Sequence, residues 1–205
     1  MSKKETTKAA KADSNAKPAK AKKEEKAPKV AKSKSAKFIE PKEGAAETLR
    51  DLFLDGLKDL YWAENHLIKG FEKLHANATS EELQTNIKEH ISETKKHIKR
   101  LDEAFSKLGE KAEAEECAAM KGLLEEAEHI VEETQPGAVR DAGIIIAIQK
   151  IEHYEIASYG SLAVFAKQMG EDEVERILRD TLNEEKATNN ILTNLAVNKV
   201  NTKAK

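Results

Sequence analysis

The chain has 205 residues, of which 35% are charged and only 4% are aromatic. This length accommodates one ordinary domain and an additional segment. A single cysteine excludes an intrachain disulfide, which favours a reducing compartment. No apolar run approaches the length needed to cross a bilayer, and the N-terminus lacks the apolar segment of a secretory signal. We therefore expect a cytoplasmic protein with no membrane partner.

The net charge of −2 conceals two segments of opposite sign. Residues 1–43 contain 14 Lys and 6 acidic residues, a net charge of +8, whereas the remainder has 21 basic and 31 acidic residues, a net charge of −10. Large apolar side chains are almost absent before Phe38, and Pro18 and Pro28 interrupt any helix. Such a segment buries too little apolar surface to offset its conformational entropy, so residues 1–43 are expected to be a disordered basic tail.

From residue 45 onward the apolar residues recur with a helical period. The first helix is expected over residues 45–77. The second begins at the capping sequence Thr79-Ser80-Glu81-Glu82 and ends before Gly109. A long connection over residues 110–137 follows, and it is expected to contain a short helix at 117–133.

Two further long helices are expected at residues 138–169, before Gly170, and at 172–196. The tight connection within each pair of long helices implies antiparallel neighbours, and the long connection between the pairs permits a crossover. We therefore predict an all-α fold: a ferritin-like four-helix bundle over residues 44–198, with a short C-terminal tail at 199–205.

Each long helix carries carboxylate or imidazole side chains near its middle. At 100° per residue, the carboxylates of the third and fourth helices and the two histidines of the second fall on or near the apolar face, whereas Glu93 falls at its flank. Mid-helix positions in a bundle share one level, so these side chains are expected to converge. The candidate metal ligands are Glu64, His90, Glu93, His97, Glu152, Glu155 and Glu185.

Buried carboxylates repel one another, and burial raises their pKa values unless cations balance them. A single Glu in an apolar stripe is often paired with a Tyr or Thr, and a single His often packs at an interface. Agreement between four helices favours a site for two divalent cations instead. Oxygen and imidazole ligands suit iron or manganese, and the absence of thiolates disfavours structural zinc. Four residues are expected to pack around or orient the ligands: Tyr61, Tyr159, Thr188 and Asn189.

Segments of all four long helices resemble the YciE/YciF-type ferritin-like proteins. The resemblance covers about residues 48–196 and is carried by Leu52-Phe53-Leu54-Asp55-Gly56-Leu57-Lys58-Asp59-Leu60-Tyr61-Trp62-Ala63-Glu64, His90-Ile91-Ser92-Glu93-Thr94, Ile151-Glu152-His153-Tyr154-Glu155-Ile156-Ala157-Ser158-Tyr159-Gly160 and Glu184-Glu185-Lys186-Ala187. It implies a di-iron centre similar to that of rubrerythrin, ferroxidase activity and a link to stress responses.

The chain departs from the general ferritin-like template, in which two helices carry Glu-x-x-His. The second helix has His90-x-x-Glu93 and Glu93-x-x-x-His97 instead, and no histidine follows Glu185 on the last helix. The resemblance therefore transfers the carboxylates and leaves open which histidine is a ligand. We expect Glu93 and Glu185 to bridge the two ions and the remaining carboxylates to be terminal ligands.

The leading hypothesis is a di-iron carboxylate protein that holds two iron ions, with manganese as the alternative, and reacts Fe(II) with O₂ or peroxide. The alternative is a structural or interaction bundle whose basic arm, residues 1–43, binds polyanions such as DNA through counterion release. Iron storage would need shell-forming contacts that the sequence does not indicate. A homodimer or another small homo-oligomer is expected.

Overall fold

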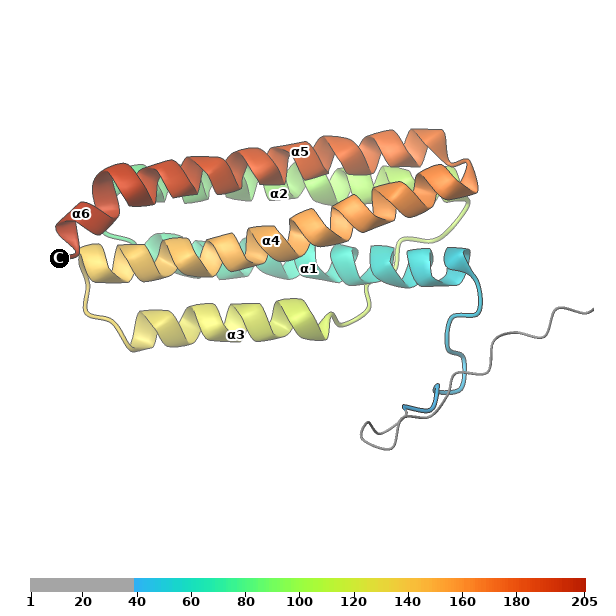
Figure 1. Cartoon of the computed structure of the whole chain (residues 1–205), viewed down its shortest axis with the longest axis horizontal. Coiled ribbons are helices and arrows are strands. Elements are labelled where there is room, and N and C mark those ends of the chain that lie inside the picture. The colour runs from blue at the N-terminus through green and yellow to red at the C-terminus, as the bar shows by residue number, and fades with distance from the viewer. Residues whose placement is uncertain (1–38) are drawn as a thin grey trace, which may run out of the picture. The chain divides into compact units, whose positions relative to one another are not determined.

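The computed structural model describes residues 39–205, and every regular element in this part of the chain is a helix (Figure 1). The predicted disordered tail at residues 1–43 lies almost entirely outside the described residues. Residues 44–205 form one unit. Its elements are α1 (Leu49–Asn77), α2 (Glu81–Leu108), α3 (Ala118–Glu132), α4 (Ala138–Met169), α5 (Asp172–Leu195), the π-helix η1 (Ala196–Val200) and α6 (Asn201–Lys203).

The four long helices form an antiparallel bundle (Figure 1). Helix α1 packs against α2 and α4, and α5 packs against the same two helices, so α1 and α5 lie on one diagonal of the bundle. The connection from α2 to α4 therefore crosses between diagonal helices, and it carries α3, which packs on α1 and α4. This arrangement confirms the predicted ferritin-like bundle with a long crossover. No helix in residues 39–205 combines the length and apolar character needed to cross a membrane.

The helix ends follow local capping chemistry. The hydroxyl of Thr48 accepts a hydrogen bond from the backbone N–H of Asp51, and the Asp51 carboxylate accepts one from the N–H of Thr48, so α1 starts at Leu49 rather than at residue 45. Helices α2 and α4 end at Gly109 and Gly170, whose positive φ angles of 72° and 80° favour glycine. These glycines are why the predicted ends of both helices are confirmed.

The C-terminal helical path extends beyond its predicted end near residue 196. It continues through η1 and α6 to Lys203, and it thus includes much of the segment 199–205 that was expected to be a tail. No glycine or proline follows Ala196 to stop the helix, and the side chain of Val200 is buried against α4. Burial of this apolar residue stabilises the extra turns.

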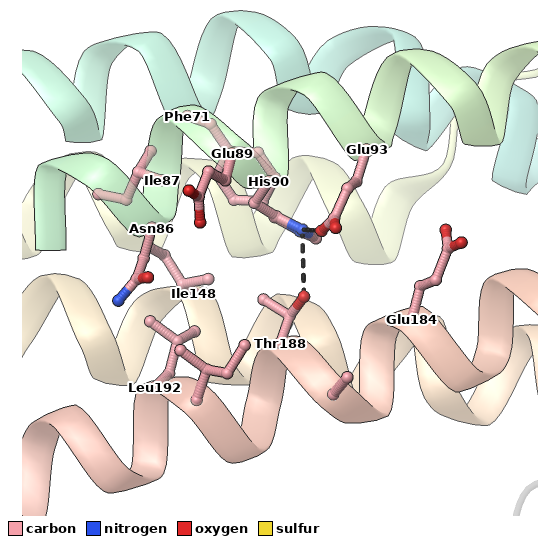
Figure 2. A pocket seen from close by; sticks show the side chains of 12 residues that line it. Phe71, Asn86, Ile87, Glu89, His90, Glu93, Ile148, Glu184, Thr188 and Leu192 are labelled. Atoms are coloured by element: carbon pink, nitrogen blue, oxygen red, sulfur yellow. Dashed lines mark hydrogen bonds and ion pairs between the residues drawn. The ribbon is translucent and has the colours of Figure 1, made fainter. Parts of the chain in front are cut away.

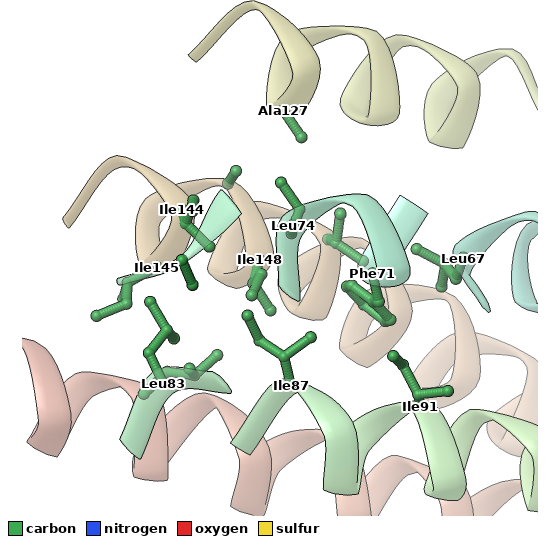
Figure 3. Packing of buried hydrophobic residues seen from close by; sticks show 14 of the residues in the cluster. Leu67, Phe71, Leu74, Leu83, Ile87, Ile91, Ala127, Ile144, Ile145 and Ile148 are labelled. Atoms are coloured by element: carbon green, nitrogen blue, oxygen red, sulfur yellow. The ribbon is translucent and has the colours of Figure 1, made fainter. Parts of the chain in front are cut away.

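The apolar core consists of two clusters, one toward each end of the bundle. The first is built around Phe71, Ile87 and Ile148 (Figure 3), and the second around Phe53 and Phe105. On each of the four long helices, the residues of one cluster are separated from those of the other by the mid-helix positions at which the predicted ligands occur. The polar residues thus occupy a layer between two apolar regions.

Candidate metal centre

Six of the seven predicted ligands meet in this layer, and each is at most 4% exposed. The potential ligand atoms of one group, on α2, α4 and α5, lie within 4.8 Å of one another, and so do those of a second group, on α1, α2 and α5. The first group is His90, Glu152, Glu155 and Glu185, and the second is Glu64, His97 and Glu185. The mid-helix positions therefore converge as the spacing predicts.

Glu185 belongs to both groups. Its Oε1 atom lies 2.9 Å from Nδ1 of His97, and its Oε2 atom lies 3.9 Å from Nε2 of His90. Each oxygen of this carboxylate faces a different histidine, which is the arrangement expected of a carboxylate between two ions. Both histidines thus have a place in the centre, one in each group.

The polar atoms of the centre lack the partners that buried groups normally have. Among the described residues, nine buried nitrogen and oxygen atoms of these six side chains make no hydrogen bond. Nε2 of His90 lies only 3.0 Å from Oε1 of Glu152, yet the two atoms are not aligned for a hydrogen bond. Leaving such atoms unpaired is costly, and cations placed among them would satisfy all of them.

The donor set fits two divalent cations. The four carboxylates of the two groups carry four negative charges when ionised, and two divalent ions supply an equal positive charge. Carboxylate oxygen and imidazole nitrogen suit iron or manganese. The centre contains no thiolate, because the single cysteine, Cys117, caps the start of α3 instead.

Burial and crowding shift the titration of the centre. Burial, followed by repulsion from Glu185 and Glu64, raises the pKa of Glu155 well above its usual range. Burial also raises the pKa values of Glu64 and Glu185. Burial alone would lower the pKa of His97, but hydrogen bonding to Glu185 and Glu64 raises it to about 10. Protons thus occupy the metal-free centre, and entering cations must displace them.

A charged pair outside the centre orients His97. Nε2 of His97 lies 2.9 Å from Oε2 of Glu184, whose two oxygens accept hydrogen bonds of 2.6 and 2.7 Å from Arg100. These hydrogen bonds from Arg100 lower the pKa of Glu184 to about 2, so this carboxylate is charged and accepts the Nε2–H. Nδ1 of His97 is then free to bind a metal. Sequence reasoning gave neither residue this role, although Arg100 follows His97 by three positions and so lies on the same face of α2.

His90 presents its two nitrogens to different surroundings. Nε2 faces the first group, whereas Nδ1 lies 3.5 Å from the Glu93 carboxylate and 3.5 Å from the Thr188 hydroxyl. The side chain of Glu93 is 37% exposed and belongs to neither group. The structure therefore does not place Glu93 as the predicted bridge, because its position at the flank of α2 directs it to the outer side of His90.

The predicted supporting residues divide into two pairs. Tyr159 donates a 2.5 Å hydrogen bond to Oε1 of Glu64, and Thr188 contacts His90 as described above. Tyr61 instead packs edge-on against Phe105, with ring centroids 5.9 Å apart. Asn189 accepts a hydrogen bond from Gln149, so neither Tyr61 nor Asn189 contacts a residue of the centre through these interactions.

Residues 48–205 match a protein-family model described as a domain of unknown function, DUF892. The chain belongs to this family. It is 44% identical over 159 residues to Protein YciF of Escherichia coli strain K12, an alignment that covers 77% of this chain and 96% of that protein. The DUF892 member described here is thus a homologue of YciF.

Two solved structures also resemble this DUF892 member. The crystal structure of the E. coli stress protein YciF superposes with a TM-score of 0.74 at 43% identity, covering 77% of this chain and 100% of that chain. YcfI from Rhodopseudomonas palustris, a proposed structural protein, gives 0.71 at 42% identity, covering 73% and 96%. The bundle is therefore the fold of the YciF stress protein.

Proposed function

We propose that this protein is a di-iron carboxylate protein that oxidises Fe(II) with O₂ or hydrogen peroxide. The observation that carries the proposal is the pair of buried groups joined by Glu185, whose polar atoms have no other partners among the described residues. The description of YciF as a stress protein supports a reaction that consumes an oxidant. The same description is compatible with the structural role proposed for YcfI, so the experiment below must separate the two.

The residues of the chain would divide the work as follows. His90, Glu152 and Glu155 would hold one ion, Glu64 and His97 the other, and Glu185 would bridge them. When bound, two Fe(II) ions supply two electrons, so that one H₂O₂ and two protons become two H₂O, or one O₂ and two protons become one H₂O₂.

The protein around the ions fixes their ligands and limits access of water. Tyr159 holds Glu64 by its hydrogen bond, and Glu184 holds His97. The apolar clusters on both sides of the polar layer exclude bulk water from the ligands. The protons that occupy the metal-free carboxylates and His97 leave as the ions bind.

The test is anaerobic reconstitution with Fe(II), followed by addition of O₂ or H₂O₂ while absorbance is recorded. We expect two iron ions per chain and rapid oxidation in the wild type. Glu64→Ala and Glu152→Ala should each slow oxidation at least tenfold, since each removes a ligand from one group. Glu103→Gln, an exposed change on α2 away from both groups, is the matched control.

Oxidation at the wild-type rate in both ligand variants would refute the proposal. Circular dichroism would verify that each variant remains folded. Metal analysis of protein purified without chelators would decide between iron and manganese as the resident ion.

A second function is favoured by the charge of residues 1–43, which lie almost entirely outside the described residues. Their net charge of +8 against −10 for the remainder supports binding to a polyanion such as DNA. A mobility-shift assay across salt concentrations, with the full chain and with residues 44–205, tests this. Binding that does not weaken with salt, or that persists without residues 1–43, would contradict it.

A further inference from the structure

A cavity of about 110 Å³ lies between α2 and α5 beside the candidate centre (Figure 2). His90 forms part of its wall, together with apolar side chains such as Phe71 and Leu192. Three carboxylates, those of Glu89, Glu93 and Glu184, also line it, and no lysine or arginine is among its lining residues. The cavity is thus a partly apolar opening with a negatively charged border.

The ring of His90 separates this cavity from the centre. Its Nε2 atom faces Glu152, 3.0 Å away, whereas the partners of its Nδ1 atom, Glu93 and Thr188, both line the cavity. Figure 2 shows these two side chains on either side of the imidazole. A rotation of the ring would therefore connect the cavity with the ligand atoms.

The three carboxylates differ in how far their charge is already used. Glu184 is held by Arg100 and His97. Neither Glu89 nor Glu93 forms an ion pair with a lysine or arginine in the described part of the chain, and the only ionic partner of Glu93 there is His90. Two carboxylates with uncompensated charge at a small opening attract cations and raise their local concentration. A neutral molecule such as O₂ would gain nothing from them.

We propose that the cavity between α2 and α5 is the entrance through which divalent cations reach the centre. Glu89 and Glu93 bind the arriving cation first, and movement of the His90 ring admits it. The inference rests on the proposed function, because it assumes that the centre binds metal. It also assigns a role to Glu93, which lies beside the centre rather than in it.

The test measures the rate at which the metal-free full-length protein binds Co(II), a cation whose absorbance reports its ligands. Glu89→Gln removes charge at the opening, and Ala187→Phe introduces a bulky ring at an exposed position that lines the cavity. Neither residue belongs to the two ligand groups. We expect stopped-flow association to slow about tenfold in each variant, while the final number of Co(II) ions per chain and their spectrum stay unchanged. Glu103→Gln on the same helix should bind at the wild-type rate.

Three results would overturn the inference. The first is a wild-type association rate in both Glu89→Gln and Ala187→Phe, which would place the entrance elsewhere. The second is a loss of bound Co(II) or an altered spectrum in Glu93→Gln, which would make Glu93 a resident ligand. The third is a wild-type protein that binds no Co(II) at the centre, which would refute the proposed function as well. Only the third result affects both proposals, so the two failures are distinguishable.

Discussion

Arg100 and Glu184 act on the centre through His97 without entering it. Glu184→Gln keeps the shape of the side chain but removes the charge that accepts the Nε2–H of His97. We expect the ion bound by the Glu64 and His97 group to be held about 10- to 100-fold more weakly, because the histidine loses its fixed orientation. The ion held by the His90 group should keep nearly its wild-type affinity.

An anaerobic Co(II) titration that resolves the two binding steps would measure this effect. Glu175→Gln is a matched control, because Glu175 also pairs with an arginine on α5 but takes no part in the two ligand groups. Equal weakening of both ions, or of neither, would contradict the orienting role.

The residue roles were only partly predictable from the sequence. Helical spacing placed Glu152, Glu155 and Glu185 on the inner face, and the structure brings them together. Glu93 and Glu184 both fall at the edge of an apolar stripe, and spacing alone does not distinguish them. What determines their roles is the partner on the neighbouring helix: Glu184 on α5 meets Arg100 and His97 of α2, whereas Glu93 on α2 stays beside His90 and Thr188 of α5.

At the scale of elements, α3 approaches the bundle closely at a glycine. A Cβ atom added at Gly143 on α4 would lie 2.6 Å from Cγ2 of Ile130 on α3, whereas one added at Gly122 on α3 would meet no atom within 4 Å. We expect Gly122→Ala to raise the free energy of unfolding by about 0.5–1 kcal/mol through helix propensity. Gly143→Ala should lower it, because the β-branched side chain of Ile130 cannot easily move aside.

Urea denaturation followed by circular dichroism would measure both variants. The two positions are matched, since each is a helical glycine changed to the same residue. Equal stabilisation by both substitutions would show that α3 does not pack tightly at this position.

A buried carboxylate ties the turn between α1 and α2 to α4. Asp141 accepts 2.7 Å hydrogen bonds from both the backbone N–H and the hydroxyl of Thr79. Asp141→Ala should lower the free energy of unfolding by about 2–3 kcal/mol, because it leaves this backbone N–H without a partner. Thermal denaturation would test the prediction, with the exposed Asp180→Ala on α5 as control. A change of less than about 0.5 kcal/mol, typical of surface sites, would refute it.

The element boundaries were predictable wherever a residue stops the helix. Gly109 and Gly170 end α2 and α4 at the expected positions. The extension through η1 and α6 could not be predicted, because it depends on the burial of Val200 against α4 rather than on a local stop signal.

For the molecule as a whole, stability without metal should fall as pH rises. The pKa of His97 is raised from 6.5 to about 10 in the folded state, so its stabilising contribution is complete below about pH 6.5 and is lost as pH rises through about 10. The raised pKa values of Glu64, Glu155 and Glu185 act in the same direction, since the folded protein retains protons that the unfolded chain releases above about pH 4.5.

We therefore expect the melting temperature of the metal-free protein to decrease between pH 6.5 and 10, while the stabilisation produced by added metal increases over the same range. Calorimetry at several pH values, with and without Mn(II), would measure both trends. His97→Gln should flatten the metal-free profile, and parallel profiles with and without metal would contradict the expectation.

The bundle architecture was predictable because local signals agreed with one another. Apolar period, capping residues and connection lengths all indicated two antiparallel pairs joined by a crossover, and the structure has this arrangement. The cavity between α2 and α5 was not predictable, since its shape depends on side chains of two helices far apart in the sequence.

The sharing of Glu185 also bears on biosynthesis. This residue comes from the last of the four long helices, and each ligand group needs it in addition to side chains from two earlier helices. A growing polypeptide on the ribosome therefore offers only incomplete sets of ligands until nearly all of the bundle has been made. Iron would then load a finished protein, and the extent of loading would depend on the iron available afterwards rather than on the pace of translation.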